Sequence, residues 1–482
     1  MLRRVQPSPR QARHLILVPI LAFFISSIEW SLLVDGGWAQ QPGGPPIASP
    51  GPLFGGAGWI WFSQFANPAL LGSLYLTPAW PKTGYYPLYP GSFSQDISEG
   101  GVLMGPLRLH PFMGVAEIYT DNVIRTNTNR KSDFATTLGP GIQARLPFAG
   151  FHTFVIDYRT NIQYYHRTSS NDVQDQTASG RFNFDFPGGL KLDLQGEHKL
   201  GHDPRGTAVD LQALEVNKWT AESFKGQAQY DGAQAGVRLN VQTIRWNFLN
   251  NNQGIIRDRL SNYAGLTFLG NATSKTSALV NFGLNQETYD QNKNLDSTIY
   301  SVSGGARWNV SDLTAGEVLV GYQYLKYSRA RTDQPGPFLS RFQRDRDSAP
   351  NFFFAGNLDW KPTPLLTVHL QPYRTIQQTV VFGTLFFVAT GANLAATHDL
   401  TESTALTLNV GVEQDRFTSP SGTFGPSGNR VDLIKNVAVG LRYRAVEWIG
   451  FGVQYAFEDR SSNVEQFSYY ANTFMLSAQA VF

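Results

Sequence analysis

Residues 154–165 read FVIDYRTNIQYY, and the alternation in this stretch decides the fold. Apolar side chains alternate with polar ones, so that the polar set is Asp157, Arg159, Asn161 and Gln163. A period of two is typical of a β-strand with one apolar and one polar face. The pattern returns in RFNFDF (181–186), LKLDLQ (190–195) and VAVGLRYR (437–444), which predicts an all-β chain.

The connections between these runs alternate in length. Short ones lie at 147–150, 187–189, 230–232, 270–274, 310–312, 361–364, 398–402 and 445–447, whereas longer polar stretches include 120–133, 200–218, 328–348 and 417–430. Divided in this way, the chain contains about 18 strands, an even number. The pattern predicts a transmembrane antiparallel up-and-down β-barrel with short periplasmic turns and long extracellular loops.

A soluble sandwich or propeller is the alternative. A sandwich shows no such short–long rhythm, and we find no repeated blade motif. Charged residues make up 16% of the 482 residues, against about 25% in ordinary globular chains. This low charge disfavours a soluble surface of this size.

The net charge of +2 is too balanced to favour a nucleic-acid partner. Since the chain has no cysteine, disulfides, thiolate metal sites and a cysteine nucleophile are excluded. No motif points to a cofactor.

The N-terminus resembles a secretory signal. Several arginines precede the apolar run LILVPILAFFISSI (15–28), and GGWAQQ supplies small residues before a cleavage point after Ala39. We therefore predict a cleaved signal peptide over 1–39, with an uncleaved signal anchor as the alternative. Proline density then predicts an irregular periplasmic leader over 40–105. Its many aromatic residues leave open a segment that plugs the pore. The barrel is expected over 106–482.

The chain ends on Phe482 after an alternating strand, whereas chain ends are usually polar and frayed. In a closed barrel the last strand pairs with the first, so a terminal aromatic lies in the interfacial belt beside outer-membrane lipid. Barrels of this class resemble one another in ending on Phe, which implies recognition by the outer-membrane assembly machinery.

Other chemistry finds little support. His198 and His202 lie on one face of a strand about 13 Å apart, so a metal site with Asp203 would need a folded loop. A calcium site at 120–133 lacks the D-x-[DN]-x-[DN]-G spacing. No G-x-S-x-G or other catalytic motif occurs, so we predict no enzyme activity.

Residues 105–142 read GPLRLHPFMGVAEIYTDNVIRTNTNRKSDFATTLGPGI, which resembles the opening of the putative β-barrel porin 2 family. The motif residues are Tyr119, Asp121, Asn122, Val123, Ser132, Asp133, Pro140 and Gly141. The resemblance extends over about 105–200. Members are often outer-membrane barrels of exopolysaccharide gene clusters, so the resemblance implies a glycan-export channel that works with a polysaccharide and periplasmic export components.

A barrel of this strand number is wide enough for an aqueous lumen. Its predicted inner face carries amides and charges of both signs, from Asp157, Arg159, Asn161, Gln163, Arg181, Asp185, Asp193, Glu197, Arg238, Asn240, Glu413, Asp415, Arg442 and Arg444. Such a wall suits hydrated, weakly charged solutes. Three functions stay open: polysaccharide export, general diffusion of small solutes, and a structural or adhesive barrel with a plugged lumen. A siderophore-type transporter is disfavoured, because about 65 residues before the barrel are too few for a plug domain.

Overall fold

The computed structural model describes residues 101–206, 215–311, 313–328, 348–378, 386–418 and 429–481, and they form one antiparallel sheet. The predicted signal peptide, most of the predicted leader and Phe482 lie outside these residues. The strands are β1 Val102–Met104, β2 Leu107–Thr120, β3 Asp133–Phe148, β4 His152–Tyr165, β5 Val173–Asp185, β6 Leu190–His202, β7 Lys218–Asp231, β8 Ala235–Phe248, β9 Arg259–Asn271, β10 Thr276–Tyr289, β11 Ser297–Ser311, β12 Thr314–Tyr327, β13 Ser348–Thr363, β14 Leu366–Gln378, β15 Phe386–Asp399, β16 Thr404–Thr418, β17 Val431–Val446, β18 Ile449–Ser462 and β19 Tyr469–Val481.

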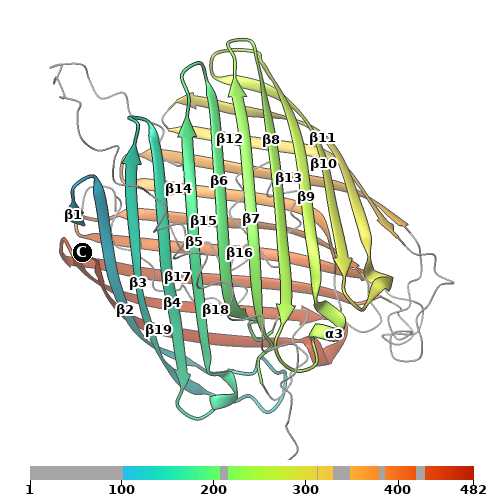
Figure 1. Cartoon of the computed structure of the whole chain (residues 1–482). Coiled ribbons are helices and arrows are strands. Elements are labelled where there is room, and N and C mark those ends of the chain that lie inside the picture. Colours follow the sequence, from blue (N-terminus) through green and yellow to red (C-terminus); the bar gives the residue numbers. More distant parts are fainter. Residues whose placement is uncertain are drawn as a thin grey trace, which may run out of the picture. The chain divides into compact units, whose positions relative to one another are not determined.

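The sheet closes on itself because β19 pairs with β2. Each strand from β2 to β19 also pairs with its neighbours in the chain, and the short β1 pairs only with β2, so the closed ring has 18 strands. The up-and-down barrel and its strand number are confirmed. Figure 1 shows β1 and the C-terminal end side by side, at the end of the barrel that carries the short turns. The segment of β1 was expected to belong to the leader.

Backbone conformations explain the short turns. Ala149 and Gly150 between β3 and β4 have φ of 47° and 82°, and Gly188 and Gly189 between β5 and β6 have φ of 94° and 90°. Positive φ is what a tight hairpin requires, and glycine adopts it without a steric cost. We call this end of the barrel the short-turn end.

The opposite end, which we call the long-loop end, carries the longer connections. Three of them contain a 3₁₀ turn, namely Ser169–Asn171, Lys293–Leu295 and Glu465–Phe467. In the first two, an aspartate after the turn accepts a hydrogen bond from the last residue of the preceding strand. Tyr165 N–H donates to Asp172 at 2.8 Å, and Tyr289 N–H donates to Asp296 at 2.7 Å. Such side-chain bonds order a loop.

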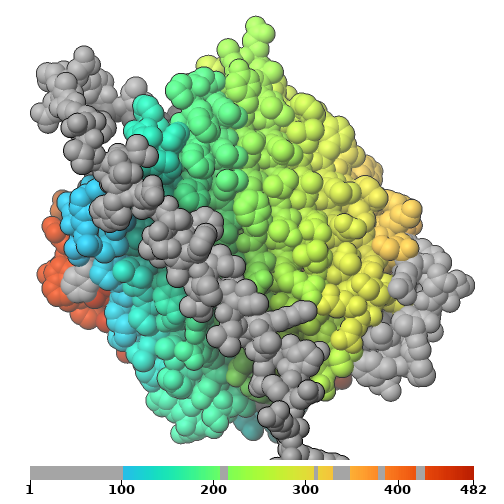
Figure 2. All heavy atoms as spheres, in the orientation of Figure 1, coloured from blue at the N-terminus to red at the C-terminus, as the bar shows by residue number. Residues whose placement is uncertain are grey.

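Along many of the strands, more exposed and more buried side chains alternate. On β8, Val237, Leu239 and Val241 are exposed, whereas Arg238 and Asn240 are buried. Figure 2 shows strands β2 to β9, from blue to yellow-green, as closely packed side chains wherever grey atoms do not cover them. Apolar side chains face outward and polar ones inward, the reverse of a soluble protein, as expected where lipid replaces water outside.

The buried face is not polar throughout. One apolar cluster joins β9, β10, β12 and β13 through Leu269, Leu279, Leu319, Phe353 and Ala355. A second lies toward the long-loop end and contains Tyr289, Leu295, Ile299, Leu325, Tyr327, Ala349, Ile376 and Phe386. The wall from β9 to β13 therefore contains apolar clusters packed like a protein core, among buried polar residues such as Asn281, Ser303 and Gln323.

Among the described residues, no helix is long and apolar enough to cross a membrane.

Candidate functional site

The buried face of β4 carries a row of polar side chains. Asp157 and Arg159 form an ion pair at 2.5 Å, and both are less than a tenth exposed. Asn161 and Gln163 continue the row toward the long-loop end and are also buried. Ile156, by contrast, is 45% exposed. The four polar residues therefore share one face of the strand.

The row continues onto β5 and β6. Arg181 donates hydrogen bonds to Asp193 on the neighbouring strand, and Lys199 pairs with Glu197 at 3.1 Å. Asp185 lies at the short-turn end of β5 and is exposed. Pairing reduces the cost of desolvating each charge and leaves the wall with little net charge of either sign.

On β8, Asn240 is buried, and Arg238 makes an ion pair with Glu317 of β12 at 3.3 Å. Three strands separate β8 from β12 in the sheet. In a flat sheet, the backbones of β8 and β12 would therefore lie about 19 Å apart. Two side chains cannot span that path, so the wall curves tightly here and the pair bridges across the interior.

The residues predicted on β16 and β17 lie in two environments. Glu413 accepts a hydrogen bond from the Tyr373 hydroxyl at 2.5 Å, and Asp415 is fully buried. Arg442 and Arg444 are partly exposed toward the short-turn end. Arg444 donates to the carbonyl of residue 402 in the turn before β16, at 2.7 Å. Its side chain therefore supports a turn.

The motif residues of the family resemblance lie where the barrel closes. Asp121 accepts hydrogen bonds from the backbone and side chain of Asn472 at 2.8 and 2.7 Å and pairs with Arg130 at 2.5 Å. Asn122 is fully buried, and its amide donates to the carbonyls of Thr126 and Tyr470. These contacts join β2, the following loop and β19, so this part of the motif holds the seam of the barrel.

Asp121 lies in a loop, outside the strands. Partial burial disfavours its ionised form, but the hydrogen bonds from Asn472 and the pairing with Arg130 outweigh this and lower the pKa of the Asp121 carboxyl. The negative charge of Asp121 therefore strengthens the contacts with Asn472 and Arg130 that hold the seam together.

The other motif residues are also structural. Asp133 accepts hydrogen bonds from Arg167 N–H at 3.2 Å and Thr168 N–H at 2.8 Å, which order the connection from β4 to β5. Val123 is buried. The Tyr119 ring lies 5.0 Å from the ring of Phe134, and Ser132 is exposed. The Pro140 carbonyl accepts a hydrogen bond from the Thr160 hydroxyl. Gly141 has no Cβ, which leaves room for the Phe112 ring.

One contact between distant strands was not predicted. The β6–β7 connection begins with a buried segment, residues 203–206, and the carbonyl of Gly206 accepts hydrogen bonds from Arg460 at 2.7 Å and the Tyr469 hydroxyl at 3.3 Å. These partners belong to β18 and β19, so the segment reaches across the long-loop end to a distant wall. The sequence showed only a long polar stretch at 200–218, since nothing local reveals where a loop will dock.

The two histidines considered for a metal site, His198 and His202, lie in different environments. His198 is exposed on β6, with Glu222 3.9 Å away. His202 is buried and its Nδ1 lies 2.9 Å from Asp175. Within the described ranges no group of three or more His, Cys, Asp or Glu side chains could hold a metal ion.

A closed barrel with an apolar outer face and a largely polar inner wall defines a porin-like β-barrel. The chain belongs to the family described as "Putative beta-barrel porin 2", whose sequence model matches residues 97–482. The resemblance seen at residues 105–200 is thereby confirmed.

Solved structures also resemble the chain. A "Bacterial polysaccharide outer membrane secretin" has 9% identity and a TM-score of 0.32, with 77% of this chain and 98% of that chain covered. The outer membrane protein opdK from Pseudomonas aeruginosa has 8% identity and a TM-score of 0.44, covering 78% and 99%. OccAB3 from Acinetobacter baumannii has 9% identity and a TM-score of 0.41, with 78% of this chain and 99% of that chain covered. Likeness at this level carries no information about what this chain transports. No curated protein sequence matches the chain.

Proposed function

We propose that this protein is a non-enzymatic outer-membrane channel through which a secreted polysaccharide leaves the cell. The observation that carries the proposal is the inner wall of β4 to β6, where paired charges and amides replace the apolar side chains of a packed core. A glycan carries its hydration and many hydroxyl groups. Amides and ion pairs exchange hydrogen bonds with such a solute without holding it at one deep site.

The outer face supports a place in the outer membrane. Exposed apolar residues cover strands on both sides of the barrel, for example Leu239 on β8 and Val439 on β17. In barrels of this type the short turns face the periplasm, and we propose the same side for β1 and the end of β19. Cleavage after Ala39 and recognition of Phe482 by the assembly machinery complete the proposal.

The family resemblance supports the cargo, since related barrels often stand in exopolysaccharide gene clusters. Such a channel receives its polymer from periplasmic export components. The family motif itself does not carry this function, because Asp121, Asn122 and Asp133 hold the barrel and its loops together.

Two contacts favour a second candidate, a diffusion porin for small solutes. The Arg238–Glu317 pair crosses the interior, and residues 203–206 dock against β18 and β19 at the long-loop end. Both place protein atoms across part of the interior, and we expect them to narrow the passage. A narrow passage suits small hydrated solutes, although an extended glycan is also slender.

A deletion strain separates the two functions. Under the export proposal it synthesises the polymer but displays none, glycan accumulates in the periplasm, and expression of the full chain restores display. Surface glycan is measured by antibody or lectin binding to intact cells and compared with the glycan released by osmotic shock. Unchanged surface glycan together with slower uptake of small solutes would replace export by the diffusion porin.

A further inference from the structure

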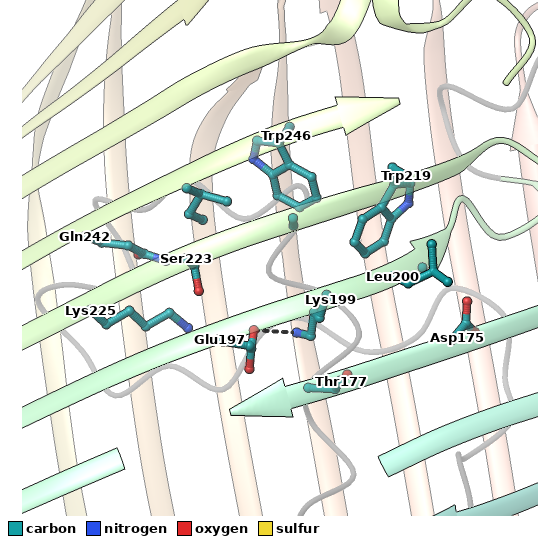
Figure 3. Close-up of a pocket in the computed structure, with 13 residues that line it drawn as sticks. Asp175, Thr177, Glu197, Lys199, Leu200, Trp219, Ser223, Lys225, Gln242 and Trp246 are labelled. Carbon is teal, nitrogen blue, oxygen red and sulfur yellow. Dashed lines mark ion pairs between the residues drawn. The ribbon is translucent and has the colours of Figure 1, made fainter. Parts of the chain in front are cut away.

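The inner wall of β5 to β8 contains a hollow of about 510 Å³, including the space that opens to its surroundings. Figure 3 shows side chains from four consecutive strands around it, with two tryptophans on one side and charged groups on the other. Of the residues that line it, only Glu197 was among those predicted to face the lumen.

Strand register explains the hollow. Across the sheet, Ala221 of β7 lies between Lys199 of β6 and Trp246 of β8. Two residues further along β7, on the same face, Ser223 lies between Glu197 of β6 and Ile244 of β8. Two short side chains between longer ones leave a depression in the wall, because neighbouring side chains on one face are about 5 Å apart.

The first side of the hollow is aromatic. The rings of Trp219 and Trp246 lie 5.2 Å apart at 67°, an edge-to-face arrangement that holds both indoles in place. Gly201, paired with Trp219 across the strands, is needed there, since a Cβ at this position would come within 2.4 Å of the indole. The aromatic surface is thus rigid.

The second side is polar. The Glu197–Lys199 ion pair lies in the hollow, and Lys225 lies on the same side (Figure 3). Two further donors, Trp219 Nε1 and Gln242 Nε2, are buried without a hydrogen-bond acceptor among the described residues. Each of these side chains is less than a tenth exposed. Buried donors without a partner are uncommon in folded proteins and cost free energy.

We propose that the hollow is a binding subsite for one pyranose unit of a glycan, an inference that rests on the proposed export function. A pyranose combines an apolar ring face with hydroxyl groups around its edge. The indoles match the face. Hydroxyl oxygens supply acceptors for the two buried donors, and hydroxyl hydrogens bond to the Glu197 carboxylate. A simple anion site would not include a carboxylate, and an apolar solute would leave the donors unpaired.

The absence of native cysteine makes a sharp test possible. Full-length Ser223→Cys barrel is reconstituted in planar bilayers and then treated with a bulky methanethiosulfonate reagent, which fills the hollow after folding. Maltohexaose and cellohexaose serve as probes with opposite linkage geometry. We expect at least one probe to interrupt the current through the wild-type and unmodified barrels. After modification, the interruptions should shorten about tenfold, equivalent to about 1.4 kcal/mol.

Two further variants complete the test. Thr407→Cys, on the inward face of β16 and likewise partly exposed, is modified in the same way and should leave the interruptions unchanged. Gln242→Leu removes one donor without blocking the passage and should also shorten them. No interruption by either probe, or equal interruption of all barrels, would overturn the subsite. Loss of surface glycan in the deletion strain would still support export in that case, so the two proposals fail separately.

Discussion

The inner wall of β4 to β6 and that of β10 to β13 are built from the same antiparallel strands, yet they are filled differently. On β4 the inward side chains from Asp157 to Gln163 are all polar. On β12 the inward set includes Leu319 and Leu325, both fully buried in apolar clusters that span several strands. We call these regions the polar wall and the apolar wall.

The difference shows that a barrel of this strand number need not enclose a uniform channel. Where the sheet curves tightly, as between β8 and β12, inward side chains from several strands meet and exclude water. Along β4 to β6 the inward charges are instead buried as ion pairs, so the inward side chains can be polar. We expect solute to pass along the polar wall, while the apolar wall stabilises the barrel.

The largest expected effect comes from a charge in the apolar wall. Leu319→Asp buries an unpaired carboxylate among Leu279, Phe353 and Ala355, which should cost about 4 kcal/mol or more. The matched control is Gln195→Glu in the polar wall, where Arg181 and Lys225 are the register neighbours. Urea unfolding of both variants measures the difference. Similar losses would show that the two walls are not distinct.

A smaller effect is expected at the boundary between the walls. Glu317→Ala leaves Arg238 buried and unpaired, at a cost of about 3 kcal/mol. Replacing both residues, as Arg238→Met with Glu317→Leu, should recover most of this loss because no charge stays buried. A double variant as unstable as the single one would contradict the bridge across the interior.

The smallest effect concerns acid at the long-loop end. Next to the apolar wall, this end is stabilised by apolar packing that includes Leu295 and Tyr289, whereas the seam beside β2 depends on the charge of Asp121. Because folding lowers the pKa of Asp121, its stabilisation is present above the ordinary value of 3.8 and disappears as pH falls through the lowered value.

Asp121→Asn should therefore reduce stability at neutral pH by up to about 1 kcal/mol and flatten the loss of stability between about pH 5 and pH 2. Thermal unfolding of both proteins across that range measures this. A variant with the same acid dependence as the wild type would place the sensitivity in other carboxylates.

Much of the site was predictable because the strand period assigns each side chain to a face. Asp157, Arg159, Arg181 and Asp193 lie in the polar wall as a set of ion pairs. No predicted inward residue lay on β9 to β14. There, apolar residues occupy both faces of a strand. In VLVGYQYL (318–325), for example, the inward Leu319 follows the outward Val318 and precedes the outward Val320. The alternation of polarity disappears, so the inward face cannot be recognised from the sequence.

By itself, the sequence determined the antiparallel strands, their number, the two kinds of connection and the family, because period-two alternation and turn residues act over short distances along the chain. Only the tertiary structure decided which strands meet across the interior. The Arg238–Glu317 bridge, the docking of residues 203–206 on Arg460 and Tyr469, and the hollow beside Trp219 and Trp246 all depend on the curvature and register of the closed sheet. Those are properties of the whole ring, and no single strand encodes them.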